Sequence, residues 1–140
     1  MSRIFWDTNL FIYLIEGSGP LSERVVALRT RMLERGDQLL TSALTLGEVL
    51  VKPIEKGRDD LQHTYEEALR STAIIVPFDE NAAVAYARIR VNRSIRPPDA
   101  IQLACASHAG VDLFLTNDDR LSKTLVPGIH FVSSLQRSPV

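Results

Sequence analysis

The sequence predicts an α/β fold with a central parallel sheet of about five strands and helices on both of its faces. Short apolar runs alternate along the chain with longer segments in which apolar residues recur at helical spacing. Strands that are connected through helices pair in parallel, and the helices then cover the sheet. The 140 residues contain no linker, repeat or low-complexity segment, so we expect residues 1–140 to form a single domain.

Two strands and four helices are expected in the first half of the chain. The first helix is apolar nearly all round, and the second has an apolar stripe and ends at Gly36. The third opens at Ser42 and should be interrupted near Pro53, because a proline ring clashes inside a helix. In chain order these elements are strand 4–6, helices 10–16 and 21–35, strand 38–41, and helices 42–51 and 59–70.

Three strands and two helices are expected in the second half. Asp79 is a good N-cap for a helix, Pro97 and Pro98 break the chain before the next one, and Gly110 ends it. The turn-forming residues 117–120 should be a loop. In chain order the elements are strand 73–78, helices 80–91 and 99–109, strands 112–116 and 129–132, and a polar tail whose last few residues should fray.

Composition is that of a soluble globular protein, with 45% hydrophobic and 24% charged residues. No apolar run approaches the roughly 20 residues of a membrane span, and no secretory signal pattern is present. We therefore expect a cytoplasmic protein without a membrane partner. The one cysteine, Cys105, lies in an apolar helical pattern, so we expect a small buried hydrophobe and not a nucleophile.

The clustering of cationic residues, and not the net charge of the chain, is the feature that suits nucleic-acid binding. The net charge is −1, which does not by itself mark a nucleic-acid binder. However, arginine, the side chain suited to bidentate phosphate contacts, supplies 13 of the 16 cationic residues. Arg88, Arg90, Arg93 and Arg96 fall close together, and they suit phosphate contacts and a solvated helix face equally well.

Four acidic residues stand at boundaries between predicted elements. Asp7 and Asp118 directly follow strands, Glu48 lies in the first turns of the helix after the second strand, and Asp99 begins a helix. Because ligands bind at the carboxyl ends of parallel strands, we expect Asp7, Glu48 and Asp118 to share one edge of the sheet. Strand order alone does not bring Asp99 to that edge.

Each of these acids also has a structural interpretation. Asp7 alone suits a helix N-cap, Thr45 and Glu48 have the spacing of a capping box, Asp99 suits a helix dipole, and Asp118 suits a turn. As a group they favour a metal site, because converging carboxylates raise one another's pKa unless a cation neutralises them. Mg²⁺ prefers oxygen ligands, and a bound ion activates water against a phosphodiester.

Four segments resemble the ordered motifs of PIN domains. In its length and in the residues of these motifs, the chain resembles the VapC-type toxin ribonucleases. The segments are residues 5–9, 41–49, 96–104 and 115–118. The resemblance implies that Asp99 joins Asp7, Glu48 and Asp118 as a ligand of Mg²⁺ or Mn²⁺, and it leaves Asp119 as an ambiguous neighbour of Asp118. It also implies a homodimer and a cognate antitoxin that fills a groove along the active site. Supporting roles fall to Thr8, Asn9, Ser42, Thr116 and Asn117.

The favoured hypothesis is a metal-dependent endoribonuclease toxin that cleaves RNA with a metal-activated water and leaves a 3′-hydroxyl. Arg93, Arg96 and Arg120 are the candidates for contacts to the RNA backbone. Single-stranded RNA is the expected target, because a flexible strand can enter a recessed site. Residues 10–15 are apolar enough to offer a partner surface in addition to core contacts.

Three other hypotheses use different residues or no catalysis. A metal-free ribonuclease would use His63, His108 or His130 as acid and base. A phosphatase or phosphotransferase would use Asp7 as nucleophile, although Asn9 stands where such enzymes usually carry a second Asp. In a non-catalytic PIN-like binding module the acids would serve only as caps.

Overall fold

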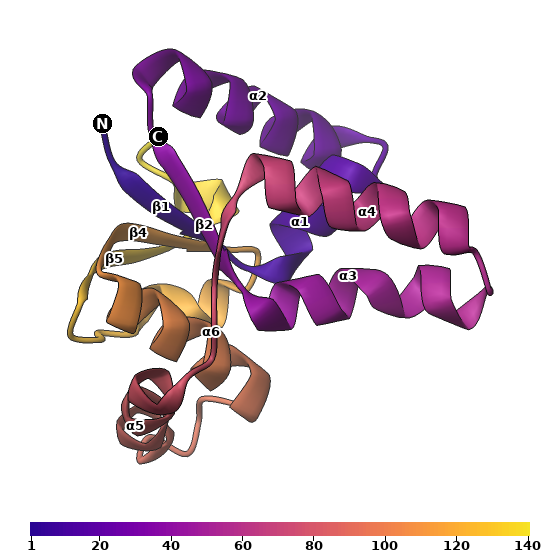
Figure 1. Cartoon of the computed structure of the whole chain (residues 1–140). Coiled ribbons are helices and arrows are strands. Elements are labelled where there is room, and N and C mark those ends of the chain that lie inside the picture. Colours follow the sequence, from indigo (N-terminus) through magenta and orange to yellow (C-terminus); the bar gives the residue numbers. More distant parts are fainter.

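The computed structural model describes all 140 residues and has an α/β fold around one sheet (Figure 1). All strand pairs are parallel, in the order β3-β2-β1-β4-β5. The predicted five-stranded parallel sheet is therefore confirmed, and β1 is its middle strand. The strands are β1 (Arg3–Trp6), β2 (Gln38–Ser42), β3 (Ile74–Val76), β4 (Val111–Thr116) and β5 (Ile129–Ser134).

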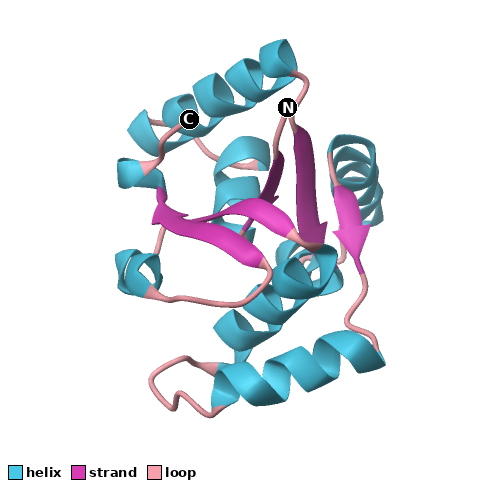
Figure 2. Cartoon of the chain, turned by 90° about the vertical axis from the view of Figure 1, so that its left-hand side faces the viewer, coloured by secondary structure: helices cyan, strands magenta, loops and turns pink.

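Helices cover both faces of the sheet, as predicted (Figure 2). Helices α1 to α4 contribute to one buried cluster, and α5 and α6 contribute to the other. None of the helices combines the length and the hydrophobicity that a membrane span requires. The helices are α1 (Thr8–Ile15), α2 (Pro20–Arg35), α3 (Ala43–Glu55), α4 (Asp59–Thr72), α5 (Glu80–Arg90) and α6 (Pro97–Ala109), with short 3₁₀ helices η1 (Asp119–Lys123) and η2 (Leu135–Arg137).

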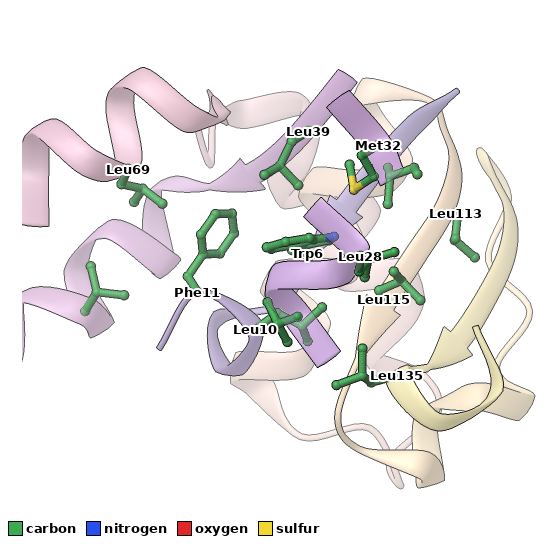
Figure 3. Close-up of a cluster of buried hydrophobic side chains, with 13 residues drawn as sticks. Trp6, Leu10, Phe11, Leu28, Met32, Leu39, Leu69, Leu113, Leu115 and Leu135 are labelled. Atoms are coloured by element: carbon green, nitrogen blue, oxygen red, sulfur yellow. The ribbon is translucent and has the colours of Figure 1, made fainter. Parts of the chain in front are cut away.

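Residues 4–6 of strand β1 are fully buried because their alternating side chains enter both clusters. Trp6 packs under α1 against Phe11, with ring centroids 5.2 Å apart (Figure 3). On the opposite face Phe5 stacks on Phe114 of β4, with centroids 5.1 Å apart. Successive residues of a strand point to opposite faces, so this short apolar strand anchors both layers and holds the residue after it, Asp7, in a fixed position.

Helix α3 continues through Pro53 to Glu55, so the predicted interruption is wrong. A proline in a helix removes one N–H bond to the carbonyl four residues earlier. Here that loss falls near the end of the helix, where the ring of Pro53 is buried. The Arg58 N–H donates to the Pro53 carbonyl at 2.9 Å, so the chain beyond the proline stays attached to the helix.

Three boundaries in the second half also differ from the prediction. Strand β3 ends at Val76, before Pro77, which has no N–H to donate. The predicted loop 117–120 is wrong in its second half, because Asp118 accepts from the Arg120 N–H at 3.0 Å and begins η1. Strand β5 runs two residues further than expected, and Leu135 after it is buried in the same cluster as Leu10 and Leu28 (Figure 3).

Candidate active site

The carboxyl ends of β1, β2 and β4 surround an acidic site. Asp7, Glu48 and Asp99 line one cavity of about 400 Å³. Asp99 also lines an adjoining cavity of about 160 Å³ together with Asp118. The structure thus brings all four predicted acids to one edge of the sheet, with Asp99 shared between the two cavities.

Asp99 reaches this edge because of the direction of α6. The helix ends at Ala109, and β4 begins only two residues later at Val111. A helix that leads directly into a strand must run back along the sheet, so its first turn lies at the carboxyl edge. Asp99 stands in that first turn, after Pro97 and Pro98.

Asp7 combines the capping role with a place in the site. It is the N-cap of α1, and its Oδ1 accepts from the Thr8 N–H at 2.8 Å. Its Oδ2 accepts from the Thr116 hydroxyl at 2.9 Å, and Thr116 Oγ1 in turn accepts from the Asp118 N–H at 3.0 Å. Only 8% of Asp7 is exposed, so the end of β4 fixes both the Asp7 carboxylate and the backbone of Asp118.

Glu48 is held by Thr8 and not by a capping box. Its Oε1 accepts from the Thr8 hydroxyl at 2.6 Å. The N-cap of α3 is Ser42, so Thr45 lies inside the helix and the capping-box interpretation is wrong. The Thr45 hydroxyl is fully buried and lies 3.1 Å from that of Thr8.

Gln102 connects these groups, and the sequence-based assignment gave it no role. Its Nε2 lies 3.0 Å from Thr8 Oγ1, 2.8 Å from Thr45 Oγ1 and 3.3 Å from Asp7 Oδ1, and its Oε1 accepts from Ser42. An amide with two hydrogens cannot serve all three acceptors equally, so the two shorter bonds hold it. The available signal was a polar residue one turn after Asp99 in a helix whose neighbouring residues are small and apolar.

We expect Gln102→Leu to destabilise the protein by about 1–3 kcal/mol, although it keeps the side-chain volume. The change removes both ends of the amide and leaves buried hydroxyls of Ser42 and Thr45 without this partner. Denaturant midpoints would measure the loss. Gln62→Leu is the matched control, since the half-buried Gln62 of α4 donates only to Glu66. An equal loss in both variants would contradict the role of Gln102.

Asp118, and not Asp119, belongs to the site. Arg120 forms a bidentate pair with Asp118, with Nε to Oδ1 at 2.9 Å and Nη2 to Oδ2 at 2.6 Å. Asp119 is exposed and pairs instead with Arg137 at 3.3 Å, away from both cavities. Of the two adjacent acids, Asp118 therefore lines the acidic cavity and Asp119 does not.

Burial and charge shift the pKa values of the acids in opposite directions. Burial raises the pKa of Asp7, opposed by its hydrogen bonds from Thr116 and Thr8. The pKa of Asp99 is raised by burial and then by the neighbouring charge of Asp118. The hydrogen bonds from Arg120 lower the pKa of Asp118. The charges of Arg96 and Arg120 oppose only part of the rise in the pKa of Asp99, and no cation forms an ion pair with Asp7 or Asp99.

The cationic residues separate into two groups. Arg96 and Arg120 line the smaller acidic cavity, and Lys52, one turn after Glu48, lines the larger one. Arg93 lines a different pocket beside Arg90. Lys52 was not among the residues predicted from sequence, although its spacing from Glu48 places both on one face of a helix.

The remaining predicted residues divide between the site and its surroundings. Asn9 is exposed and lines the larger cavity, whereas Asn117 donates to the Tyr13 hydroxyl at 2.9 Å. The histidines lie apart from the acids and from one another, each beside its own carboxylate: His63 by Glu67, His108 by Asp79 and His130 by Asp112. They share no cavity with the acids, as a histidine-based site would require.

The donors of the larger cavity fit a hard divalent cation. Mg²⁺ is usually held by one or two carboxylates together with waters, and Asp7 and Asp99 supply two whose charges are not neutralised by a paired cation. In the present arrangement no three acidic, histidine or cysteine groups converge as a metal cage, since Glu48 is bonded to Thr8 and Asp118 to Arg120. The fit is thus to an ion that keeps several of its waters.

These features define a class of protein: a single parallel α/β domain whose strand ends gather carboxylates with hydroxyl and amide partners. The family model described as the PIN domain matches residues 4–125, and the chain belongs to that family. The chain is also 32% identical over 121 residues to Ribonuclease VapC23 of Mycobacterium tuberculosis, in strains CDC 1551 / Oshkosh and ATCC 25618 / H37Rv. The match covers 85% of this chain and 95% of that relative.

Solved toxin–antitoxin complexes share the fold. VapBC2 from Rickettsia felis, bound to a DNA fragment from its promoter, matches with a TM-score of 0.75 at 13% identity, over 94% of this chain and 98% of that chain. DNA-bound VapBC from Salmonella typhimurium matches with a TM-score of 0.73 at 21% identity, over 96% and 99%. At these identities the likeness establishes the fold alone.

Proposed function

We propose that this chain is a VapC-type toxin, a metal-dependent endoribonuclease that acts on RNA in the cytoplasm and is inhibited by a cognate antitoxin. The observation that carries the proposal is the shared cavity of Asp7, Glu48 and Asp99 at the carboxyl edge of the sheet. The 32% identity to a ribonuclease of this type supports it. The structural neighbours from toxin–antitoxin complexes support an antitoxin as the partner.

Asp7, Glu48 and Asp99 would hold Mg²⁺ or Mn²⁺, with Asp118 close to Asp99. When bound, such an ion supplies an activated water and polarises the phosphoryl oxygen. The chain supplies the orientation: Thr8 and Thr116 hold the Glu48 and Asp7 carboxylates in place.

The cationic side chains at the same edge bind the RNA backbone. Arg96 and Arg120 line the cavity that holds Asp99 and Asp118, and Lys52 lines the cavity on the other side of Asp99. Cations on both sides of the acids suit a phosphate chain that passes over them. Single-stranded RNA is the favoured substrate, because its backbone bends into a recessed site.

The direct test incubates purified protein with single-stranded RNA in Mg²⁺, in Mn²⁺ and with a chelator, and maps the product ends. We expect cleavage only with metal, to products with 3′-hydroxyl ends. Equal cleavage in chelator, or cyclic phosphate ends, would contradict the metal mechanism. Hydrolysis of a small phosphate monoester without cleavage of RNA would favour a phosphatase instead.

The toxin role and the homodimer have separate tests. Induced expression should arrest growth, and only co-expression of the neighbouring antitoxin reading frame should restore it. Growth that is indifferent to that frame would contradict the pairing. Light scattering on the purified chain and on the complex would show whether each contains two copies of this chain.

A further inference from the structure

A further cavity, of about 580 Å³, lies between α5, α6 and the segment 120–127. Its lining includes three cations, Arg88, Arg120 and Lys123, and no carboxylate. In a chain whose net charge is −1, this is a local concentration of positive charge. A cavity of this size accommodates a small-molecule or nucleotide-sized group.

This cavity adjoins the acidic site. It shares lining residues with the small cavity that contains Asp99 and Asp118, so a ligand can extend from one into the other. The four shared residues are Ser94, Ile95, Arg120 and Thr124.

The cations of the cavity are available to an anion. Arg88 and Lys123 form no ion pair with any carboxylate of the chain. Arg120 uses Nε and Nη2 for Asp118 and leaves Nη1 without a protein acceptor. A phosphate next to the acidic site would therefore meet an arginine that is already fixed in position.

The rest of the lining suits a nucleobase. Asn92 Oδ1 accepts from the Ser94 N–H at 3.1 Å and from its hydroxyl at 2.7 Å. These bonds fix the amide and leave both hydrogens of Nδ2 free to donate. The apolar part of the lining includes Ile95, which is buried, and Leu125, a residue that is 93% exposed. Splayed bases of single-stranded RNA are bound by stacking on aromatic rings or arginine planes and by hydrogen bonds to their edges. Of these groups the lining offers arginine and the amide of Asn92.

We propose that this cavity binds one nucleotide of the RNA beside the cleaved phosphodiester, and that it sets the base preference of cleavage at that position. This inference rests on the proposed ribonuclease function. Arg88 and Lys123 bind the phosphate, and Asn92 donates to the base. An acidic peptide from a protein partner would also meet the cations, but it would have no reason to extend into the catalytic acids.

Binding is measured first in the Asp7→Asn background, so that no cleavage interferes. The probe is a short fluorescein-labelled single-stranded RNA of mixed sequence, titrated between about 50 and 200 mM salt. Combining Arg88→Ala with Lys123→Ala should weaken binding and reduce the slope of log Kd against log salt by roughly 0.7, the contribution of one neutralised phosphate of a single strand. The control is Arg70→Ala on α4, whose cation forms no ion pair and lies outside these cavities.

Base preference is measured next in the active protein, by mapping cut sites in the same mixed RNA. Asn92→Asp keeps the acceptor for Ser94 and removes the amide donor. We expect it to change the preference at one position beside the cut by about tenfold, from the usual contribution of a specific base contact. The overall cleavage of a mixed pool should change much less than the preference.

The outcomes separate this proposal from the function on which it rests. Cleavage by the wild type with unchanged binding and unchanged preference in the variants would overturn the nucleotide site and leave the ribonuclease intact. Absence of cleavage, with RNA binding that still depends on Arg88 and Lys123, would overturn the ribonuclease and retain the site. Loss of antitoxin binding in these variants, with RNA binding unchanged, would identify a protein-docking surface and overturn the proposal.

Discussion

Replacing Asp7 by Asn is expected to reduce metal-dependent RNA cleavage by at least about 100-fold. Groups that only orient a metal ligand already contribute 10–100-fold when they are removed, and Asp7 is the buried carboxylate at the centre of the site. Asn keeps the size of the side chain and one oxygen for the Thr8 N–H. The loss should therefore arise from the missing charge and not from unfolding.

Asp37→Asn is the matched control for this variant. Asp37 is also buried, at 9% exposure, and it also accepts from a backbone N–H, that of Ser2, at 2.8 Å. It precedes β2, at the opposite edge of the sheet from the acids, and pairs with Arg35. Initial rates of RNA cleavage with Mg²⁺ should be unchanged in Asp37→Asn, and Asp7→Asn cleaving at the wild-type rate would exclude the proposed role of Asp7.

The central strand and the location of three acids were accessible from sequence because local patterns determine them. A short apolar run that ends abruptly in Asp7 has to be a buried strand, and parallel pairing then brings Asp7, Glu48 and Asp118 to one edge. Asp99 was placed there only by family resemblance. Yet the close succession of α6 and β4 around Gly110 contained the same information, since a helix that leads into a strand begins at the carboxyl edge.

Other parts of the site depend on contacts between distant segments. Gln102 bonds to Ser42 and Thr45, about 60 positions away in the chain, and no local pattern predicts which hydroxyls a buried amide meets. The choice between Asp118 and Asp119 likewise depends on Arg120 and on Arg137 from the last turn. The cationic cavity beside the acids combines α5, α6 and the chain after η1, and only the fold brings these together.

Saturating Mg²⁺ should stabilise the protein by about 2.7 kcal/mol when its concentration is 100 times the Kd, which raises the melting temperature of a domain of this size by on the order of 10 °C. The reason is electrostatic. Burial raises the pKa values of Asp7 and Asp99, so the folded, metal-free protein binds these protons more tightly than the unfolded chain does. A divalent ion supplies the positive charge that the site lacks.

The shifted pKa values determine how the stability of the metal-free protein and the Mg²⁺ shift change with pH. Because the folded pKa of Asp7 lies above its unfolded value of about 3.9, Asp7 costs no stability below that value. The cost grows as the pH rises from the unfolded to the folded pKa and is constant above it. Asp99 acts in the same direction, whereas Asp118, whose pKa is lowered, contributes a stability that is lost on acidification. Metal binding requires the ionised ligands, so the Mg²⁺ shift should increase as the pH is raised through the folded pKa values of Asp7 and Asp99.

Mg²⁺ should consequently reverse the order of the melting temperatures of the wild type and Asp7→Asn. Without Mg²⁺ at neutral pH, Asp7→Asn should melt higher than the wild type, because it removes a buried charge. With saturating Mg²⁺ the wild type should melt higher, because only it retains the central ligand. Asp37→Asn should keep the full metal shift, as it leaves the acidic edge unchanged. Differential scanning calorimetry with and without metal measures all three proteins, and an unchanged order in Mg²⁺ would mean that Asp7 serves as a helix cap and does not bind the ion.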